Sequence, residues 1–351
     1  MTPSRLVFPL LLLAAATACR GSGATTPRAG DTAKVPITDL ATGTYLGFQG
    51  GLYPNGTNDL PAAHRAAGIA GARTVVPLDT AGTPALSGRY VLLSIGMSNT
   101  TQEFCSQSGA PGSCDVWSFM GRAAADPAVN RGALAIVNGA RGGQTASVWT
   151  SPSSAEYDRI RDVWLTPAGL SEKQVQAIWV KVANAQPTRS LPDTSADART
   201  LVRQLGQIAR ALKTRYPNVR QIFLSSRIYA GYATTTLNPE PYAYESGFAV
   251  KWVVQAQIAQ AASGTVDPRA GDLRYDGGAA APAAWMAWGP YLWAAGTTPR
   301  SDGLTWVPAD FASDGTHPAQ SGRQKVGTML LAFFKSSPVT RCWFVAGAAC
   351  E

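Results

Sequence analysis

Histidine is scarce in this chain, with only His64 and His317 among 351 residues. The sequence also has no Cys-x-x-Cys pair. Zinc centres built on several histidines or on paired cysteines are therefore not expected. A histidine that acts as a general base must be one of these two residues.

Clustered charge is missing as well. Charged residues make up 15% of the chain, and the formal net charge is +8. The positive charges are mostly arginines that are scattered singly, with no basic run. A protein that follows a nucleic-acid backbone needs a cationic patch or stripe. We therefore expect no nucleic-acid partner.

The only long apolar run lies near the N-terminus and is too short to span a bilayer comfortably. Arg5, the apolar residues 6–16 and the small residues 16–18 predict a signal peptide over residues 1–18. Cys19 follows directly and resembles the lipobox cysteine of bacterial lipoproteins, although Ala16 stands where leucine is usual. We expect export, either as a secreted or periplasmic protein or as a cell-surface lipoprotein attached to the membrane through Cys19. An ordinary signal-peptide cysteine is the alternative for Cys19.

Residues 19–41 are rich in Gly, Ala, Thr and Pro without hydrophobic periodicity, which predicts a flexible linker. Residues 42–337 are numerous and apolar enough for one well-buried domain. Residues 338–351 form a C-terminal tail.

Apart from Cys19, the four cysteines fall into two close pairs. In an exported protein, local disulfides Cys105–Cys114 and Cys342–Cys350 are the economical pairing.

Apolar strands and helical patterns alternate along the body. Continuous apolar runs predict strands at 89–95, 133–137, 175–183 and 219–225. Helical spacing predicts helices at 62–72, 197–216, 245–262 and 321–334. This alternation predicts an α/β fold, a three-layer α/β/α sandwich with a central parallel sheet. In such sheets the ligand site lies beyond the carboxyl ends of the strands.

The predicted strand ends carry candidate catalytic groups. Ser98 follows the first strand, and a glycine-rich turn at 138–145 follows the second, with backbone amides that could face an oxyanion. Asn184 follows the third strand. The segment from Asp314 to His317, an Asp-x-x-His pattern, comes just before the last helix.

The order of these blocks resembles the SGNH hydrolase superfamily, also called GDSL-type esterases, over nearly all of the body. The resemblance implies a flavodoxin-like sheet, Ser98 as nucleophile, His317 as general base and Asp314 as the acid that orients it. It also implies an oxyanion hole formed by the Ser98 amide, Gly143 and Asn184, and it requires no metal or cofactor.

Alternatives accompany several of these assignments. Gly142 could replace Gly143, and Asp302 could replace Asp314 as the orienting acid. Ser98 alone could be a helix cap. His64 is the other histidine, and its ordinary interpretation is a surface or capping residue.

The blocks also depart from the family pattern. Met97 stands where the first block usually has Asp, and the third block, residues 182–185, lacks its usual glycine and aspartate. The final Asp-Gly-Thr-His-Pro block is intact. The Gly-x-Ser-x-Gly elbow of α/β-hydrolases is excluded because Thr100 replaces its second glycine.

A long insertion of about 85 residues separates the fourth strand from the histidine block, and it is rich in Tyr and Trp. By position it could wall the cleft and stack on sugar rings, or its aromatics could form a small core of their own. The candidate substrate-binding residues are Asn99, Arg141, Gln144, Tyr229 and Trp288.

We therefore expect a secreted serine esterase that removes a short acyl group, such as acetyl, from a carbohydrate or another small ester. The alternatives are a non-catalytic carbohydrate-binding protein on the same fold and an O-acyltransferase. We expect a monomer. The whole chain also resembles a group of secreted bacterial proteins that share stretches such as 93–104 and 288–293.

Overall fold

The computed structural model describes residues 1–2, 34–106 and 114–350. Most of the predicted signal peptide and Cys19 lie outside these residues. The folded body begins at Lys34, so the linker predicted over 19–41 ends earlier than expected. The reason is helix α1 (Ile37–Leu40), whose Ile37 is fully buried and donates its N–H to the hydroxyl of Tyr291.

Five parallel strands form the central sheet, in the order β4-β3-β5-β6-β7. Their bounds are β3 (Tyr90–Gly96), β4 (Leu134–Asn138), β5 (Val175–Lys181), β6 (Gln221–Leu224) and β7 (Trp285–Trp288). The sequence predicts the first four. Strand β7 was not expected because its four residues lie within the aromatic insertion and are too few to show a periodicity.

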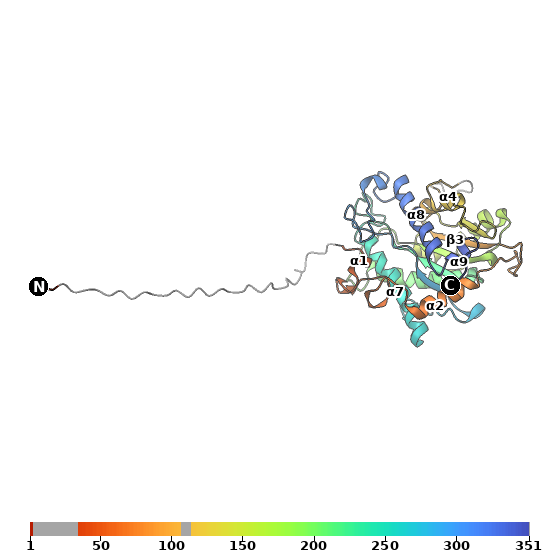
Figure 1. Cartoon of the computed structure of the whole chain (residues 1–351), viewed down its shortest axis with the longest axis horizontal. Coiled ribbons are helices and arrows are strands. Elements are labelled where there is room, and N and C mark those ends of the chain that lie inside the picture. Colours follow the sequence, from red (N-terminus) through yellow and green to blue (C-terminus); the bar gives the residue numbers. More distant parts are fainter. Residues whose placement is uncertain (3–33, 107–113, 351) are drawn as a thin grey trace. The chain divides into compact units, whose positions relative to one another are not determined.

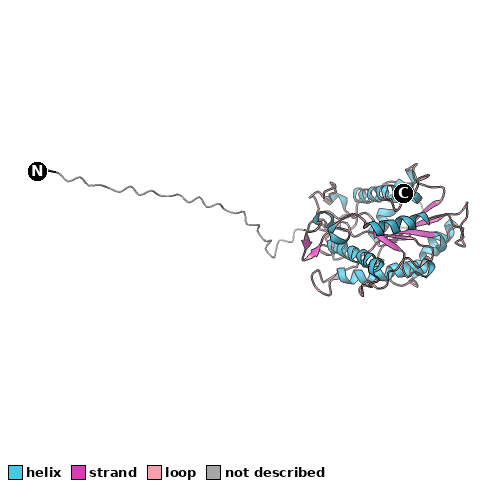
Figure 2. Cartoon of the chain, turned by 60° about the horizontal axis from the view of Figure 1, so that its bottom comes forward, coloured by secondary structure: helices cyan, strands magenta, loops and turns pink. Residues whose placement is uncertain are grey.

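Helices cover both faces of this sheet (Figure 2). On one face lie α6 (Asp197–Arg215) and α7 (Tyr242–Ser263), with α5 (Ala155–Arg159). On the other lie α2 (Ala62–Arg73), α3 (Ser98–Phe104), α4 (Phe119–Ala125), α8 (Gln320–Ser336) and α9 (Arg341–Phe344), several of which are labelled in Figure 1.

Strand β3 shows why two core layers form. Successive side chains of a strand point to opposite faces. Val91, Leu93 and Ile95 accordingly pack under α6 and α7, whereas Tyr90 and Leu92 pack on the α8 side. The α/β/α sandwich with a central parallel sheet is therefore confirmed.

Short elements complete the body. A two-stranded hairpin, β1 (Thr44–Tyr45) and β2 (Phe48–Gln49), pairs antiparallel outside the main sheet. Single helical turns occupy Pro54–Gly56, Ala146–Trp149, Ile160–Leu165, Thr166–Ala168, Glu172–Gln174, Gly278–Ala280 and Pro308–Asp310.

Both predicted disulfides, Cys105–Cys114 and Cys342–Cys350, are present. Within the described residues, none of the helices combines the length and the apolar character that a membrane crossing requires.

Candidate active site

Ser98 lies where strand β3 ends and helix α3 begins. Gly96 makes this turn possible, because a Cβ atom there would lie 2.3 Å from the carbonyl oxygen of Lys181 and 2.4 Å from Oγ1 of Thr100. The close approach of β3 to β5 therefore requires glycine. The turn places the Ser98 hydroxyl at the carboxyl edge of the sheet, where such folds bind their ligands.

Three side chains form a hydrogen-bonded chain at this edge. Ser98 Oγ lies 2.8 Å from Nε2 of His317. The Nδ1 atom of the same ring lies 2.5 Å from Oδ2 of Asp314. The imidazole is therefore held between a hydroxyl and a carboxylate, which is the arrangement of a nucleophile, a base and an orienting acid.

The Asp-Gly-Thr-His turn preorganises this geometry. Asp314 Oδ1 accepts hydrogen bonds from the backbone N–H groups of Thr316 and His317, each 2.9 Å long. Gly315 has a φ of +62°, and a Cβ atom on it would lie 1.9 Å from the carbonyl oxygen of Tyr232. The turn therefore needs glycine at this position and is fixed before any substrate arrives.

The charge on Asp314 determines the tautomer of the imidazole. Burial acts to raise the pKa of Asp314, but the hydrogen bonds from His317 and Thr316 outweigh it, and the net pKa lies below the usual value. An ionised carboxylate can only accept, so Nδ1 carries the proton and Nε2 accepts from Ser98. Asp302, the alternative orienter, instead binds Arg300 through two bonds of 2.8 and 2.6 Å.

Two backbone amides are available to an oxyanion. Among the described residues, no acceptor meets the N–H of Ser98 or that of Gly143. Gly143 has a φ of +80° and lines the same cavity as Ser98. Gly142 is close as well, since a Cβ atom on it would lie 3.8 Å from Cβ of Ser98. The glycine-rich turn predicted to face the nucleophile does lie beside it.

The Asn184 amide is differently placed from what the family resemblance implies. Its Nδ2 donates to Oδ1 of Asp197 at 2.9 Å and to Oε1 of Gln204 at 2.8 Å. Both amide hydrogens are therefore engaged away from the Ser98 hydroxyl, although Asn184 lines the cavity. Among the described residues, the candidate donors beside Ser98 that have no acceptor are therefore backbone amides, those of Ser98 and Gly143.

A cavity of about 510 Å³ opens at the Ser98 hydroxyl. Its lining combines the candidate catalytic groups with residues from other strand ends, namely Met97, Ser98, Asn99, Gly143, Thr145, Asn184, Ala185, Gln186, Arg227, Leu237, Asn238, Thr316 and His317. Arg227 and Asn238 were not predicted from the sequence. Arg227 comes three residues after β6, and its position after a strand end is the same signal that marks Ser98 and Asn184.

Among the predicted substrate-binding residues, only Asn99 lines this cavity, and its Nδ2 donates to the carbonyl oxygen of Thr316. Arg141 is exposed and pairs with Glu156 at 3.1 Å. Gln144 folds back to the carbonyl oxygen of Gly142.

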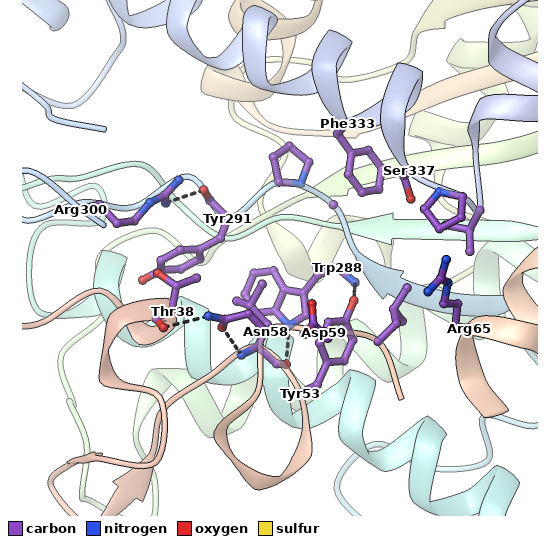
Figure 3. A pocket seen from close by; sticks show the side chains of 16 residues that line it. Thr38, Tyr53, Asn58, Asp59, Arg65, Trp288, Tyr291, Arg300, Phe333 and Ser337 are labelled. Carbon is purple, nitrogen blue, oxygen red and sulfur yellow. Dashed lines mark hydrogen bonds between the residues drawn. The ribbon is translucent and has the colours of Figure 1, made fainter. Parts of the chain in front are cut away.

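The structure places the aromatic candidates elsewhere. Tyr229 packs edge-on against Tyr232 and Trp293. Trp288 lines a separate cavity of about 770 Å³, where its backbone N–H meets the Tyr53 hydroxyl (Figure 3). The aromatics of the insertion are mostly core, because strand β7 passes through it and its side chains are buried.

Two further ionisable side chains, His64 and Lys181, are buried. His64 is 3% exposed, so it is neither a surface nor a capping residue; its Nε2 lies 2.8 Å from the carbonyl oxygen of Met286, and burial lowers its pKa. Lys181 forms a fully buried ion pair with Glu103 at 2.5 Å, which joins the end of β5 to α3. Among the described residues, no group of three or more His, Cys, Asp or Glu side chains is placed to hold a metal ion.

Comparison with known proteins gives structural similarity only. No family model and no curated protein matches the chain. Among solved structures, TesA is 15% identical, with a TM-score of 0.35, covering 71% of this chain and 99% of its own. A family two carbohydrate esterase from Cellvibrio japonicus is 12% identical, with a TM-score of 0.36, covering 72% of this chain and 62% of its own.

A protein assigned as an SGNH hydrolase from Slackia heliotrinireducens is 16% identical, with a TM-score of 0.32, covering 70% of this chain and 99% of its own. SGNH hydrolases are thus among the structures that this chain resembles, as its motifs predict. At these identities and TM-scores the similarities carry no argument about its chemistry, which rests on its own residues.

Proposed function

We propose that this chain is an exported serine esterase that removes a short acyl group, such as acetyl, from a carbohydrate. One observation carries the proposal, namely the hydrogen-bonded chain from Ser98 through His317 to Asp314 at the mouth of a cavity. A purely binding site has no need for a hydroxyl, an imidazole and a carboxylate in this order. The two disulfides support export.

The first half of the reaction acylates the enzyme. Nε2 of His317 takes the proton of Ser98 as the hydroxyl oxygen attacks the ester carbonyl, and the imidazolium that forms is stabilised by Asp314. The negative charge on the former carbonyl oxygen is held by the free N–H groups of Ser98 and Gly143. Loss of one such donor typically costs about 3 kcal/mol in the barrier. The imidazolium then returns its proton to the departing alcohol.

The second half releases the acyl group. Water loses a proton to Nε2 of His317 and attacks the acyl-serine carbonyl, after which Ser98 regains its proton and the acid leaves. The same donors stabilise the second tetrahedral intermediate.

The lining around the site supports a polar alcohol component. A second cavity of about 390 Å³ shares Thr145, Asn184, Ala185 and Gln186 with the cavity of Ser98. Its remaining wall is mostly polar, formed by Ser147, Pro187, Thr188, Arg189, Ser195, Asp197, Thr200 and Gln204. Hydroxyl and amide groups beside a reactive serine suit a hydroxyl-rich alcohol such as a sugar.

The test is hydrolysis of p-nitrophenyl acetate by the mature chain and by Ser98→Ala, with labelling by a fluorophosphonate probe. We expect the wild type to turn over and to carry one label, and Ser98→Ala to lose both. Ser147→Ala, which removes a hydroxyl from the neighbouring cavity, is the matched control and should keep the label. Acetylated glycans then identify the substrate.

Other outcomes select other functions. If the wild type neither turns over nor labels, the esterase proposal fails and glycan binding becomes the hypothesis to test. If acyl groups pass to a sugar faster than to water, the protein is an O-acyltransferase.

A further inference from the structure

Arg227 lines the cavity of Ser98, and the proposed esterase mechanism gives it no role. It follows β6 at the carboxyl edge of the sheet, and 2% of its surface is exposed. It lines the same cavity as Ser98 and His317. A guanidinium so deeply buried normally has a bound anion or acceptors for its N–H groups.

Two of the three guanidinium nitrogens lack such a partner within the described part of the chain. They are Nε and Nη2, which are buried and have no hydrogen-bond acceptor there. The carboxylates near enough to favour its charge are Glu103, Glu240 and Asp314. Each is already bound, Glu103 to Lys181, Asp314 to His317, and Glu240 to the indole of Trp293 and to backbone amides.

Other arginines of the chain use the same two nitrogens, Nε and Nη2, to bind a carboxylate. Nε and Nη2 form one edge of the planar guanidinium, and this edge matches the two oxygens of a carboxylate. Four arginines hold an aspartate in this way, in the pairs Arg161–Asp162, Arg269–Asp267, Arg274–Asp272 and Arg300–Asp302. In Arg227 the same edge is buried without a carboxylate.

A second residue of the same cavity lining, Asn238, also has an unpartnered buried polar atom. Asn238 is 4% exposed, and its Nδ2 donates to the carbonyl oxygen of Asn184 at 2.9 Å. That bond fixes the amide orientation, and its Oδ1 has no donor among the described residues. Arg227 thus contributes a cation and Asn238 an amide to the lining of the cavity, which suits a substrate that carries both a carboxylate and a hydroxyl.

We propose that Arg227 binds a carboxylate of the ester substrate, so that this site selects anionic esters. This inference rests on the proposed esterase function and narrows its substrate class. The carboxylate could belong to the acyl group, as in a dicarboxylic half-ester, or to the alcohol, as in an acylated sugar acid. Asn238 accepts a hydrogen bond from a hydroxyl of the same substrate.

Matched ester pairs test the proposal and distinguish the two sources. For the acyl side, mono-p-nitrophenyl succinate is compared with its methyl-capped diester. For the alcohol side, 4-acetoxybenzoate is compared with its methyl ester. We expect kcat/KM of the wild type to favour the free carboxylate by about 10-fold or more in one pair, because hydrogen bonds to charged groups are stronger than those between neutral groups. No preference in either pair overturns the proposal.

Substitutions of Arg227 test whether this residue causes the preference for the free carboxylate. In Arg227→Gln the preference should fall to about 2-fold or less. Arg227→Lys, which keeps the charge without the two-nitrogen edge, should keep only part of it. Leu237→Ala changes the same cavity without changing its charge and should keep the preference of the wild type. If Arg227→Gln keeps the preference and only melts at a lower temperature, Arg227 is a buried counter-charge and the proposal is wrong.

A binding measurement separates this inference from the esterase proposal. Turnover of p-nitrophenyl acetate that depends on Ser98, without a carboxylate preference, refutes the role of Arg227 and leaves the esterase intact. If no ester is turned over, the esterase proposal fails, and the role of Arg227 is then tested by binding. Calorimetry on Ser98→Ala compares succinate with succinamide, and glucuronate with glucose. Binding of a carboxylate but not of its neutral analogue, reduced in Arg227→Lys, supports the site. Equal binding of the charged and the neutral member of each pair overturns the proposal. This outcome can be read even if Arg227→Gln does not fold.

Discussion

At the residue scale, Asp314 accepts from His317 Nδ1 and from two backbone N–H groups, which leaves the imidazole one orientation. An amide at this position would keep the turn but could donate to Nδ1, and that favours the wrong tautomer.

We therefore expect Asp314→Asn to lower kcat on p-nitrophenyl acetate by about 10³–10⁴-fold with little change in KM. The matched control is Asp302→Asn, which removes the exposed carboxylate that binds Arg300 and should leave kcat nearly unchanged. A loss below about 10-fold in Asp314→Asn would contradict the assigned role.

Also at the residue scale, the side-chain amide of Asn184 donates to Asp197 and Gln204 and not to the site beside Ser98. Burial raises the pKa of Asp197, and the bond from Asn184 opposes that rise. Removing the amide therefore weakens a buried carboxyl site.

We expect Asn184→Ala to lower the melting temperature and to reduce kcat by less than about 10-fold, below the 10²–10³-fold typical of a lost oxyanion donor. Steady-state kinetics and thermal unfolding on the same preparation distinguish the two cases. A loss of 10²-fold or more in kcat at an unchanged melting temperature would instead mean that the amide turns to the oxyanion during the reaction.

At the element scale, the buried pair of Lys181 and Glu103 joins the end of β5 to the helix that Ser98 begins. Burial lowers the pKa of Lys181 to about 8 and raises that of Glu103, while each partner opposes the shift of the other. Removal of one partner leaves a buried charge without its counter-ion.

We expect Lys181→Met to reduce the free energy of unfolding by about 3–5 kcal/mol, measured by urea denaturation. The double variant Lys181→Met with Glu103→Leu removes both charges and should recover much of that loss. If the double variant loses as much free energy of unfolding as the two single variants added together, the two side chains are not energetically coupled.

At the scale of the whole molecule, Glu245 on α7 joins segments far apart in sequence. It accepts from the hydroxyl of Tyr45 in the N-terminal hairpin and from the backbone N–H of Leu191. Burial raises the pKa of Glu245 to about 7, assisted by Glu240 and Asp197 and opposed by the two hydrogen bonds.

A raised carboxyl pKa means that the folded chain binds this proton more tightly than the unfolded chain. The stabilisation is therefore complete below about pH 4.3, the ordinary value for glutamate, and is lost as the pH rises through about 7. We expect the melting temperature to fall less in Glu245→Gln than in the wild type when the pH is raised from 5 to 8.

The difference between the two proteins isolates Glu245 from the other titrating groups. Asp193→Asn is the control, because the pKa of Asp193 is lowered to about 2 and the residue does not titrate in that range. An identical pH dependence of the wild type and Glu245→Gln would show that Glu245 is already ionised in the folded protein.

What the sequence determined by itself is local. The turn from Asp314 to His317 closes through hydrogen bonds within four residues, so its motif predicts its geometry. The hydrophobic pattern predicts the buried strands from β3 to β6 and the long helices. Ser98 is predicted as a candidate nucleophile from its position after the first of these strands.

The tertiary structure decided what depends on contacts distant in sequence. Strand β7 exists because it pairs with β6, and Trp288 is thereby placed in a cavity apart from Ser98. The amide of Asn184 donates to Asp197 and Gln204 on α6 rather than toward Ser98, as the resemblance to SGNH hydrolases had implied. Arg227 lines the cavity of Ser98 only because the strand order brings the end of β6 to the same edge as β3. Burial and pairing over such separations depend on how the layers pack, which no short pattern encodes.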